Sequence, residues 1–183
     1  TLPTARAHGL ADLQIVVDAH ERYAWKFADQ QATTTVRALP AGDYAVELDG
    51  ELVASVERKS VADLASSLST GRLKFALADL ASLPRAAVVV EGRYSEIFGL
   101  AHVRGSVLAD GLAECAAAWP QVPIQFCENR KLAQEWTFRF LGATLAAARE
   151  RADLAAVGDG LRTVEVDVTQ LDAAPRSSVR RPA

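Results

Sequence analysis

The sequence predicts one α/β domain in which helices flank a mixed β-sheet, and three observations support this prediction. Residues 43–59 alternate between apolar and polar side chains on either side of an Asp-Gly pair, which is the pattern of an antiparallel hairpin. Residues 86–90 form an uninterrupted apolar run, typical of a strand covered on both faces. Long stretches with helical periodicity follow these strands. The 183 residues are expected to form one domain with a substantial core.

The other elements are predicted from apolar runs and from the residues that interrupt them. A short apolar run, a β-branched run and a late apolar run predict three further strands, at 13–17, 33–39 and 124–127. Helical periodicity predicts helices at 60–83 (interrupted at Gly71), 103–119 and 129–151. Prolines after the first two helices provide stops. An alternating stretch at 161–168 predicts an extra strand, and the residues from 172 onward are expected to be disordered.

The alternation in the hairpin also selects its register. Pairing Leu48 with Leu52 places all the apolar residues of the two strands on one face. The same register sets Asp43 opposite Glu57, with Lys59 two residues further along on the same face. A slip by one residue would set apolar residues against polar ones, so the pattern disfavours it.

Two opposed carboxylates suggest a metal site. Directly opposed residues have Cβ atoms about 4.5–5.5 Å apart. At that distance the carboxylates of Asp43 and Glu57 repel each other, and a shared divalent cation relieves the repulsion. Lys59 lies near enough to act on whatever the cation binds. The alternative is a solvated polar face without chemistry, and geometry alone leaves both interpretations open.

The residues of this region also resemble a known signature. Gly42-Asp43-Tyr44, then Glu57-Arg58-Lys59 and Asp63 four residues later, is similar to the GD…ERKxxxD signature of the XPF nuclease family. That family is a branch of the PD-(D/E)xK metal-dependent nucleases. Gly71-Arg72-Leu73 also matches its usual continuation, and the resemblance spans about residues 13–148.

The resemblance implies a restriction-endonuclease-like fold and Mg²⁺- or Mn²⁺-dependent hydrolysis of a DNA phosphodiester. Asp43 and Glu57 are expected to hold the metal, with Asp18 as a third ligand. Lys59 is expected to position the attacking water or to stabilise the developing negative charge. Arg58 belongs to the signature, but strand alternation points it away from Lys59, so we expect it to act through a local bend or by supporting the sheet.

Asp18 lies in a segment, Val17 to Glu21, that resembles the V-D-x-R-E segment of the family. In the family this aspartate belongs to the active site. His20 stands where the family commonly has arginine, so the resemblance supports no phosphate contact at this position. The residue pattern by itself also allows Asp18 to end the strand and cap the following turn.

Four further polar residues are candidates for the site, and three of them have a second interpretation. Asp63 completes the family signature, yet Ser60 and Asp63 also have the spacing of a capping box that starts a helix. Arg72 and Lys74 are expected to reach a DNA phosphate, although a solvated helix face explains them equally well. Glu91 ends the apolar run at 86–90, where the family has a similar acid, and is a weaker additional candidate.

Other chemically capable residues have structural explanations. Tyr23, Trp25 and Phe27 alternate and either pack in the core or line the cleft, and we expect core packing. Cys115 and Cys127 lie in apolar surroundings without metal-ligand spacing, so buried free thiols are expected. The three histidines are scattered, which argues against a zinc site.

Composition limits the function further. A net charge of −3 is unusual for a nucleic-acid-binding protein, so weak and salt-sensitive DNA binding is expected. The arginines at 176, 180 and 181 either contact the DNA backbone or belong to a free tail. No apolar run is long enough to span a membrane and no signal peptide is visible, so a soluble, cytoplasmic protein is expected.

For domain organisation, we expect an XPF-type nuclease domain at 11–151 and a partly disordered C-terminal extension at 152–183. Many members of the family carry tandem helix-hairpin-helix domains after the nuclease, and residues 152–183 are too few for that pair. DNA grip is therefore expected from the nuclease surface, from a homodimer, or from a separate DNA-targeting partner protein. The helix at 129–151 carries more apolar residues than one core-facing stripe needs, which predicts a homodimer interface there.

Taken together, these features predict a DNA endonuclease that acts on branched, flapped or damaged DNA in repair or recombination. A rival interpretation is a catalytically silent nuclease-fold module that binds DNA or dimerises. The acidic charge favours this rival, and the intact Asp43, Glu57 and Lys59 argue against it. A metal-dependent hydrolase of a small ester fits the carboxylates but not the family signature.

Overall fold

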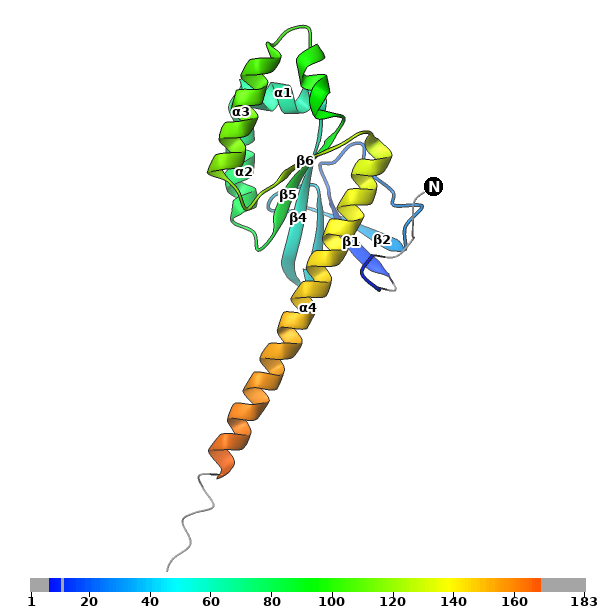
Figure 1. The fold of residues 1–183 in the computed structure, drawn as a ribbon. Coiled ribbons are helices and arrows are strands. Elements are labelled where there is room, and N and C mark those ends of the chain that lie inside the picture. Colours follow the sequence, from blue (N-terminus) through cyan, green and yellow to red (C-terminus); the bar gives the residue numbers. More distant parts are fainter. Residues whose placement is uncertain (1–6, 11, 169–183) are drawn as a thin grey trace, which may run out of the picture. The chain divides into compact units, whose positions relative to one another are not determined.

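The computed structural model describes residues 7–10 and 12–168, with side chains described through residue 159. Its strands are β1 (Leu13–Asp18), β2 (Ala32–Arg37), β3 (Tyr44–Leu48), β4 (Glu51–Ser60), β5 (Ala86–Glu91) and β6 (Ile124–Cys127). Its helices are α1 (Val61–Ser69), α2 (Arg72–Ala81), η1 (Tyr94–Gly99, a 3-10 helix), α3 (Gly105–Ala118) and α4 (Arg130–Val168) (Figure 1).

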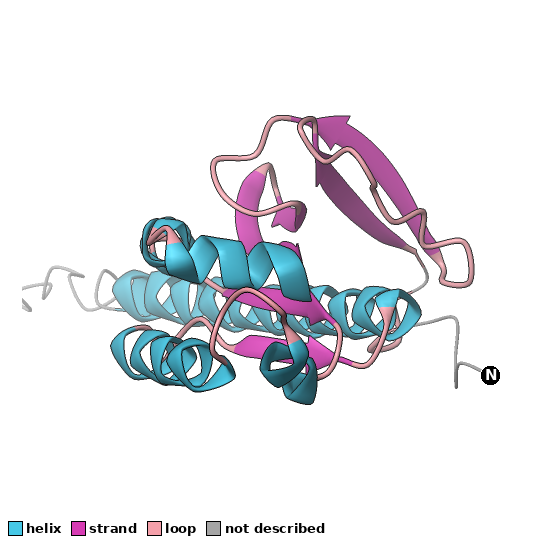
Figure 2. Ribbon diagram, turned by 90° about the horizontal axis from the view of Figure 1, so that it is seen from above, coloured by secondary structure: helices cyan, strands magenta, loops and turns pink. Residues whose placement is uncertain are grey.

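The six strands form one mixed sheet in the order β2-β1-β3-β4-β5-β6. The hairpin β3–β4 is antiparallel and central, while β4, β5 and β6 run parallel to one another. Helices lie against the sheet, and strands and helices segregate into layers (Figure 2). This confirms the predicted α/β fold with a mixed sheet flanked by helices.

Alternate residues of the central strands enter two separate cores. On one face, side chains of β1, β3, β4 and β5 pack with Trp25, Phe27 and the buried residues Ala133, Phe138 and Leu141 of α4. On the other face, Val88 and Val90 of β5 pack with apolar residues of α1, α2 and α3. Because β5 is covered on both faces, its continuous apolar run is explained.

The hairpin register is the predicted one at the end that carries Asp43, and differs near the turn. Tyr44 pairs with Val56 as expected, but Leu48 pairs with Glu51 and not with Leu52, so that part of the prediction was wrong. Asp49 and Gly50 both have positive φ, 53° and 84°, as a two-residue loop matched to strand twist requires. A register shift between Val46 and Glu47 absorbs the difference.

Gly71 separates α1 from α2 because it adopts a left-handed conformation, with φ 74°, that a continuing helix does not allow. The predicted strand at 161–168 is wrong, because these residues continue α4. A strand needs a neighbouring strand for its backbone groups, whereas a helix satisfies them internally.

The chain forms two compact units, Thr1–Ala148 and Arg149–Ala183, and α4 contributes to both. The predicted domain boundary after residue 151 stays a prediction. Disorder from residue 172 onward and the arginines at 176, 180 and 181 lie outside the described residues. Among the helices of the described part, none is both long and apolar enough to cross a bilayer.

Candidate active site

Asp43 lies just before β3, where the backbone of Gly42 brings it against β4. Gly42 has φ 80°, and a Cβ at this position would lie 2.2 Å from the hydroxyl oxygen of Ser55, so only glycine fits. The backbone N–H of Asp43 donates to the carbonyl of Val56 at 2.8 Å. Its carboxylate accepts a hydrogen bond from the backbone N–H of Arg58 at 2.7 Å. The carboxylate is therefore held against β4 by main-chain contacts.

Glu57 and Lys59 project from β4 beside Asp43. The ammonium of Lys59 lies 2.8 Å from the Glu57 carboxylate, and both side chains are largely buried. Burial and the negative charge of Glu57 raise the pKa of Asp43 to about 7, and these outweigh the hydrogen bond from Arg58. The two carboxylates therefore interact strongly, as the hairpin register predicted.

The chemistry of this donor set fits a divalent cation. Mg²⁺ prefers oxygen ligands and is commonly held by one or two carboxylates, with water and substrate phosphates completing its shell. Asp43 and Glu57 supply two carboxylates, and burial together with the negative charge of Glu57 raises the pKa of Asp43. Among the described residues, no group of three or more Asp, Glu, His or Cys side chains converges. With Asp43 and Glu57 as ligands, a cation would complete its shell from water, from substrate or, as the resemblance implies, from Asp18.

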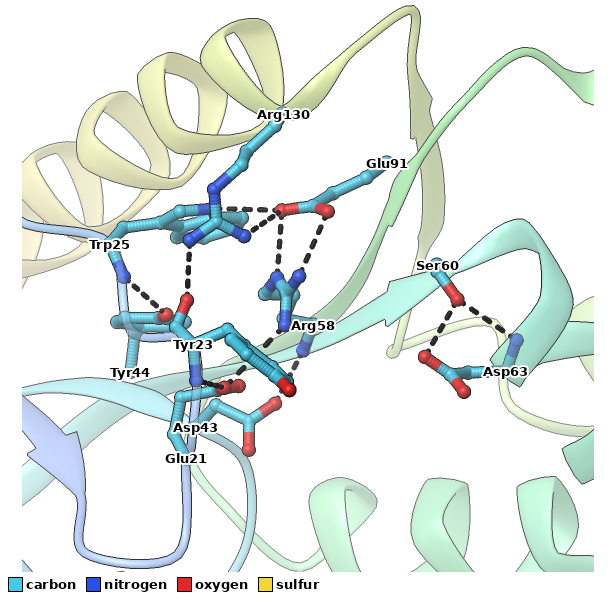
Figure 3. A network of polar contacts seen from close by, with 10 residues as sticks. All are labelled: Glu21, Tyr23, Trp25, Asp43, Tyr44, Arg58, Ser60, Asp63, Glu91 and Arg130. Atoms are coloured by element: carbon cyan, nitrogen blue, oxygen red, sulfur yellow. Dashed lines mark hydrogen bonds and ion pairs between the residues drawn. The ribbon is translucent and has the colours of Figure 1, made fainter.

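The side chain of Arg58 lies on the other face of β4 and joins four segments of the chain. Its guanidinium makes hydrogen bonds to both carboxylate oxygens of Glu91, at 2.7 and 2.9 Å (Figure 3). Arg130 at the start of α4 also reaches Glu91, at 3.1 Å, and the indole N–H of Trp25 donates to it at 2.8 Å. Burial raises the pKa of Glu91, but the hydrogen bonds from Arg58 and Trp25 lower it by more.

This network explains the signature arginine as a support of the sheet, which is one of the two roles expected from the sequence. The Glu91 carboxylate is not free, because it accepts hydrogen bonds from Arg58, Trp25 and Arg130. Glu91 is therefore a positioning residue in this arrangement, and not a ligand available to a metal.

Glu21 lies at the candidate site, although the sequence patterns did not single it out. Its carboxylate is 9% exposed and lies 3.5 Å from the guanidinium of Arg58. It is also close enough to Asp43 to contribute to the raised pKa of that residue. The available signal was the V-D-x-R-E-like segment, in which Glu21 occupies the final position and only Asp18 was assigned a role.

Asp18 and Asp43 lie next to each other through the backbone, because the N–H of Asp18 donates to the carbonyl of Asp43 at 2.8 Å. The Asp18 carboxylate is used locally: it accepts from the backbone N–H groups of Leu39 at 2.8 Å and His20 at 2.9 Å. Burial raises the pKa of Asp18, and these hydrogen bonds outweigh that effect and lower it. Asp18 thus caps the turn after β1, and its role as a third metal ligand stays a prediction.

Asp63 caps α1. Its backbone N–H donates to the hydroxyl of Ser60 at 3.0 Å, and that hydroxyl donates back to its carboxylate at 2.7 Å. This is the capping interpretation of the Ser60–Asp63 spacing. Asp63 also lines a hollow of about 310 Å³ next to Lys59, so both roles remain compatible.

Arg72 and Lys74, which the sequence treated alike, lie in different surroundings. Arg72 lines the same hollow as Lys59 and donates to the hydroxyl groups of Thr70 and Ser66. Lys74 instead pairs with Glu114 of α3 across 3.4 Å on an exposed surface. The structure therefore brings Arg72, and not Lys74, to the side of the candidate site.

The three aromatic residues of the β1–β2 loop differ in their burial. Trp25 and Phe27 are buried, and Trp25 stacks on Tyr44 with ring centroids 4.5 Å apart. Tyr23 is 73% exposed, so core packing was a correct prediction for two of the three aromatics and wrong for Tyr23. Its ring lies at the protein surface because the loop turns outward after Glu21, whose carboxylate accepts from the backbone N–H of Tyr23. Cys115 and Cys127 are buried free thiols, as expected.

A mixed sheet whose central hairpin carries two interacting carboxylates and a lysine defines a nuclease-type α/β domain. The family model of the ERCC4 domain matches residues 17–140, which is most of the chain. The chain belongs to the ERCC4-domain family, the family of XPF-type nuclease domains. This confirms the resemblance noted in the sequence.

Two solved structures show the same fold. XPF from Aeropyrum pernix is 22% identical, with a TM-score of 0.58 over 74% of this chain and 61% of that one. XPF from Aeropyrum pernix in complex with DNA is 21% identical, with a TM-score of 0.54 over 76% of this chain and 66% of that one. The chain thus spans less than two thirds of the first structure's length. No curated protein sequence matches it.

Proposed function

We propose that this chain is a Mg²⁺- or Mn²⁺-dependent DNA endonuclease that hydrolyses phosphodiester bonds. The observation that carries the proposal is the Asp43 carboxylate, whose pKa burial and the negative charge of Glu57 raise to about 7, with Lys59 paired to Glu57 at 2.8 Å. A pair of carboxylates with a perturbed pKa and an adjacent cation is typical of a catalytic site.

Each of these residues has a separate task in the proposed reaction. Asp43 and Glu57 would hold the metal, which supplies polarisation of the phosphate and a lower pKa of the attacking water. The backbone N–H of Arg58 orients the Asp43 carboxylate. Lys59, whose ammonium lies 2.8 Å from the Glu57 carboxylate, would orient the attacking water or stabilise negative charge on the phosphate. Asp43 must be deprotonated to act as a ligand.

The hollow beside Lys59 supports a place for the DNA backbone. The residues that line it are Lys59, Asp63, Ser66, Ser67 and Arg72. They include two positively charged side chains and two hydroxyl groups. Arginine and hydroxyl side chains are common phosphate contacts. We infer that Arg72 contacts a phosphate neighbouring the cleaved one, whereas Lys74 serves the surface between α2 and α3.

Substrate choice is proposed from the family and from the charge of the chain. XPF-type domains suggest branched, flapped or damaged DNA in repair or recombination. A net charge of −3 and few cations near the site favour weak binding that requires the divalent ion. A separate partner protein or a second copy of the chain would then supply additional grip.

A homodimer is part of the proposal, through only part of the helix at 129–151 that was expected to form the interface. Phe138, Leu141 and Leu145 of that helix are buried in the chain's own core. Trp136 and Phe140 stack on each other and pack against that core. We therefore place the proposed dimer interface at the edge of β6, where Phe126, Leu132 and Trp136 line a hollow of about 520 Å³.

The proposal is tested by incubating the purified protein with flap, fork, single-stranded and duplex DNA in Mn²⁺, in Mg²⁺ and in EDTA. Cleavage that requires the metal and favours branched DNA is the expected result. Metal-independent cleavage contradicts the assigned ligands. DNA binding without cleavage in either metal would support the catalytically silent module instead.

A further inference from the structure

Tyr23 is a large aromatic residue on the surface within a loop whose other aromatics are buried. Its side chain is 73% exposed, whereas those of Trp25 and Phe27 are 2% and 1% exposed. Basic residues of the same loop, Arg22 and Lys26, are exposed as well. The loop between β1 and β2 therefore presents an aromatic ring with cationic neighbours, the combination that binds single-stranded nucleic acid.

The backbone around Tyr23 is fastened on both sides. Its N–H donates to the carboxylate of Glu21 at 2.7 Å, and its carbonyl accepts a hydrogen bond from Arg130 at the start of α4. Two residues later, the N–H of Trp25 donates to the buried hydroxyl of Tyr44 at 2.9 Å. A ring on such a fixed backbone loses little freedom when it contacts a ligand.

These contacts also place Tyr23 beside the candidate site. Glu21, which holds the Tyr23 backbone, lies 3.5 Å from the guanidinium of Arg58. The backbone N–H of the same Arg58 binds Asp43 at 2.7 Å. Figure 3 shows the Tyr23 ring on the same side of this network as Glu21 and Asp43. Tyr23 is therefore connected to Asp43, a proposed metal ligand, through Glu21 and Arg58.

We propose that Tyr23 determines substrate specificity by stacking on an unpaired nucleobase next to the cleaved phosphodiester. The inference rests on the proposed nuclease function. A phosphate held through a cation at Asp43 and Glu57 would carry a neighbouring base outward, toward the loop whose Glu21 acts on Asp43 and holds the Tyr23 backbone. A base in a duplex is already stacked between its neighbours, so the ring gains a contact only with an unpaired or frayed base. Tyr23 thus favours single-stranded or branch-point DNA over continuous duplex.

The test measures DNA affinity in Ca²⁺, which we use to replace the catalytic ion and prevent turnover. The probes are a fluorescein-labelled single-stranded oligonucleotide and the duplex of the same sequence, followed by fluorescence anisotropy. Tyr23→Ala is expected to weaken single-strand binding about tenfold, the loss of roughly one stacking contact, and duplex binding less than about twofold. Tyr23→Phe and Tyr23→Trp are expected to bind like the wild type, and Tyr23→Leu like Tyr23→Ala.

Phe75→Ala is the matched control. The exposed fraction of Phe75, 74%, is similar to the 73% of Tyr23, but Phe75 projects from α2 and is not among the residues that line the hollow beside Lys59. It is expected to leave both affinities unchanged. Circular dichroism establishes that each variant is folded.

An abasic scan gives an independent readout. One abasic nucleotide is moved through the positions around the cleaved bond in the single-stranded probe. At one position the lesion should weaken wild-type binding while leaving Tyr23→Ala unaffected, because the stacking contact is already lost.

Three results would each overturn the stacking role. Tyr23→Ala could weaken single-stranded and duplex binding equally, or Tyr23→Leu could bind like the wild type. In the third, the affinity losses from the abasic lesion and from Tyr23→Ala would be additive at every position. A wild-type protein that cleaves DNA while Tyr23→Ala binds unchanged overturns this inference and leaves the nuclease proposal intact. A wild-type protein that neither binds nor cleaves any of the probes overturns the nuclease proposal, and this inference with it.

Discussion

The backbone N–H of Arg58 donates a 2.7 Å hydrogen bond to the carboxylate of Asp43, while its guanidinium binds Glu91 on the other face of the sheet. One residue therefore orients a proposed metal ligand through its main chain and ties β4 to β5, α4 and the β1–β2 loop through its side chain. This relationship accounts for an arginine between Glu57 and Lys59, where strand alternation points it away from the reaction.

The first prediction concerns this buried ion pair. Arg58→Leu should lower the free energy of unfolding by about 3–5 kcal/mol, because it leaves the largely buried carboxylates of Glu91 and Glu21 without their main partner. Glu91→Leu should also destabilise, and the double variant should lose less than the sum of the two. Urea unfolding measures all three.

Lys74→Leu is the control for this cycle, because its ion pair with Glu114 is exposed and 3.4 Å long. It should change stability little. Additive losses for Arg58→Leu and Glu91→Leu would show that the two side chains do not stabilise each other.

The second prediction concerns pH. The pKa of Asp43 is raised from 3.8 to about 7, so the folded, metal-free protein binds more protons than the unfolded chain between these values. Its stability should therefore fall as the pH rises from about 4 to about 7. Asp43→Asn removes the buried charge and can still accept the Arg58 hydrogen bond. It should stabilise the protein by up to about 4 kcal/mol at pH 8, because the pKa is raised by about three units at about 1.4 kcal/mol each, and little at pH 4.

Thermal unfolding in EDTA at several pH values checks this difference, with the exposed Asp79→Asn on α2 as the control that should show none. Adding Mn²⁺ at pH 8 should raise the Tm of the wild type and not that of Asp43→Asn. A stability difference that is independent of pH would mean that Asp43 titrates normally.

The third prediction separates catalytic from capping carboxylates. Asp43→Asn and Glu57→Gln should each reduce cleavage at least about 10³-fold without loss of folding, because each removes one of two proposed ligands. Lys59→Ala should reduce turnover while Mn²⁺ still raises the Tm. Asp63→Asn should retain most activity, since its N–H still binds the Ser60 hydroxyl and caps α1. Initial cleavage rates on flap DNA give the ranking, and near-wild-type activity in Asp43→Asn or Glu57→Gln would exclude that residue as a ligand.

The fourth prediction concerns the glycine before Asp43. Gly42→Ala places a Cβ 2.2 Å from the Ser55 hydroxyl oxygen and 3.2 Å from the Val56 carbonyl oxygen, at φ 80°. It should destabilise by about 2 kcal/mol or more and displace the Asp43 carboxylate, so activity falls as well. Gly50→Ala is a matched control, because Gly50 has φ 84° with nothing within 4 Å of the added Cβ. It should cost about 1 kcal/mol and leave the cleavage rate unchanged. Equal effects of the two variants on activity would mean that the close approach of Gly42 to Ser55 is unimportant.

The fifth prediction concerns assembly. If the edge of β6 forms the dimer interface, Leu132→Asp should convert a dimer into a monomer, because it places a charge in the apolar hollow beside Trp136. Val36→Asp is the control, since Val36 is 67% exposed on β2, at the opposite edge of the sheet. Light scattering at tens of micromolar measures both. A wild-type monomer at that concentration would refute the dimer.

Much of the fold could be predicted because it follows from local patterns. The apolar run of β5, the Asp49-Gly50 turn and the break at Gly71 each depend on residues adjacent in the chain. The register error near Leu48 was also local: the alternation favours pairing Leu48 with Leu52, the two-residue Asp49-Gly50 turn pairs Leu48 with Glu51, and the shift after Val46 accommodates both. The strand predicted at 161–168 failed because alternation is weak evidence where no partner strand is available.

The sequence alone determined the core of the candidate site. Asp43, Glu57 and Lys59 belong to one hairpin, so the period-two geometry of strands and one register bring them together. Tertiary structure alone decided the rest: that Glu91 and Trp25 engage Arg58, that Asp18 turns to the N–H of Leu39, and that Tyr23 stays at the surface. The physical reason is that these contacts join segments tens of residues apart. Which partner satisfies a buried charge or covers an aromatic ring is settled only when the sheet and α4 pack, and no local periodicity encodes it.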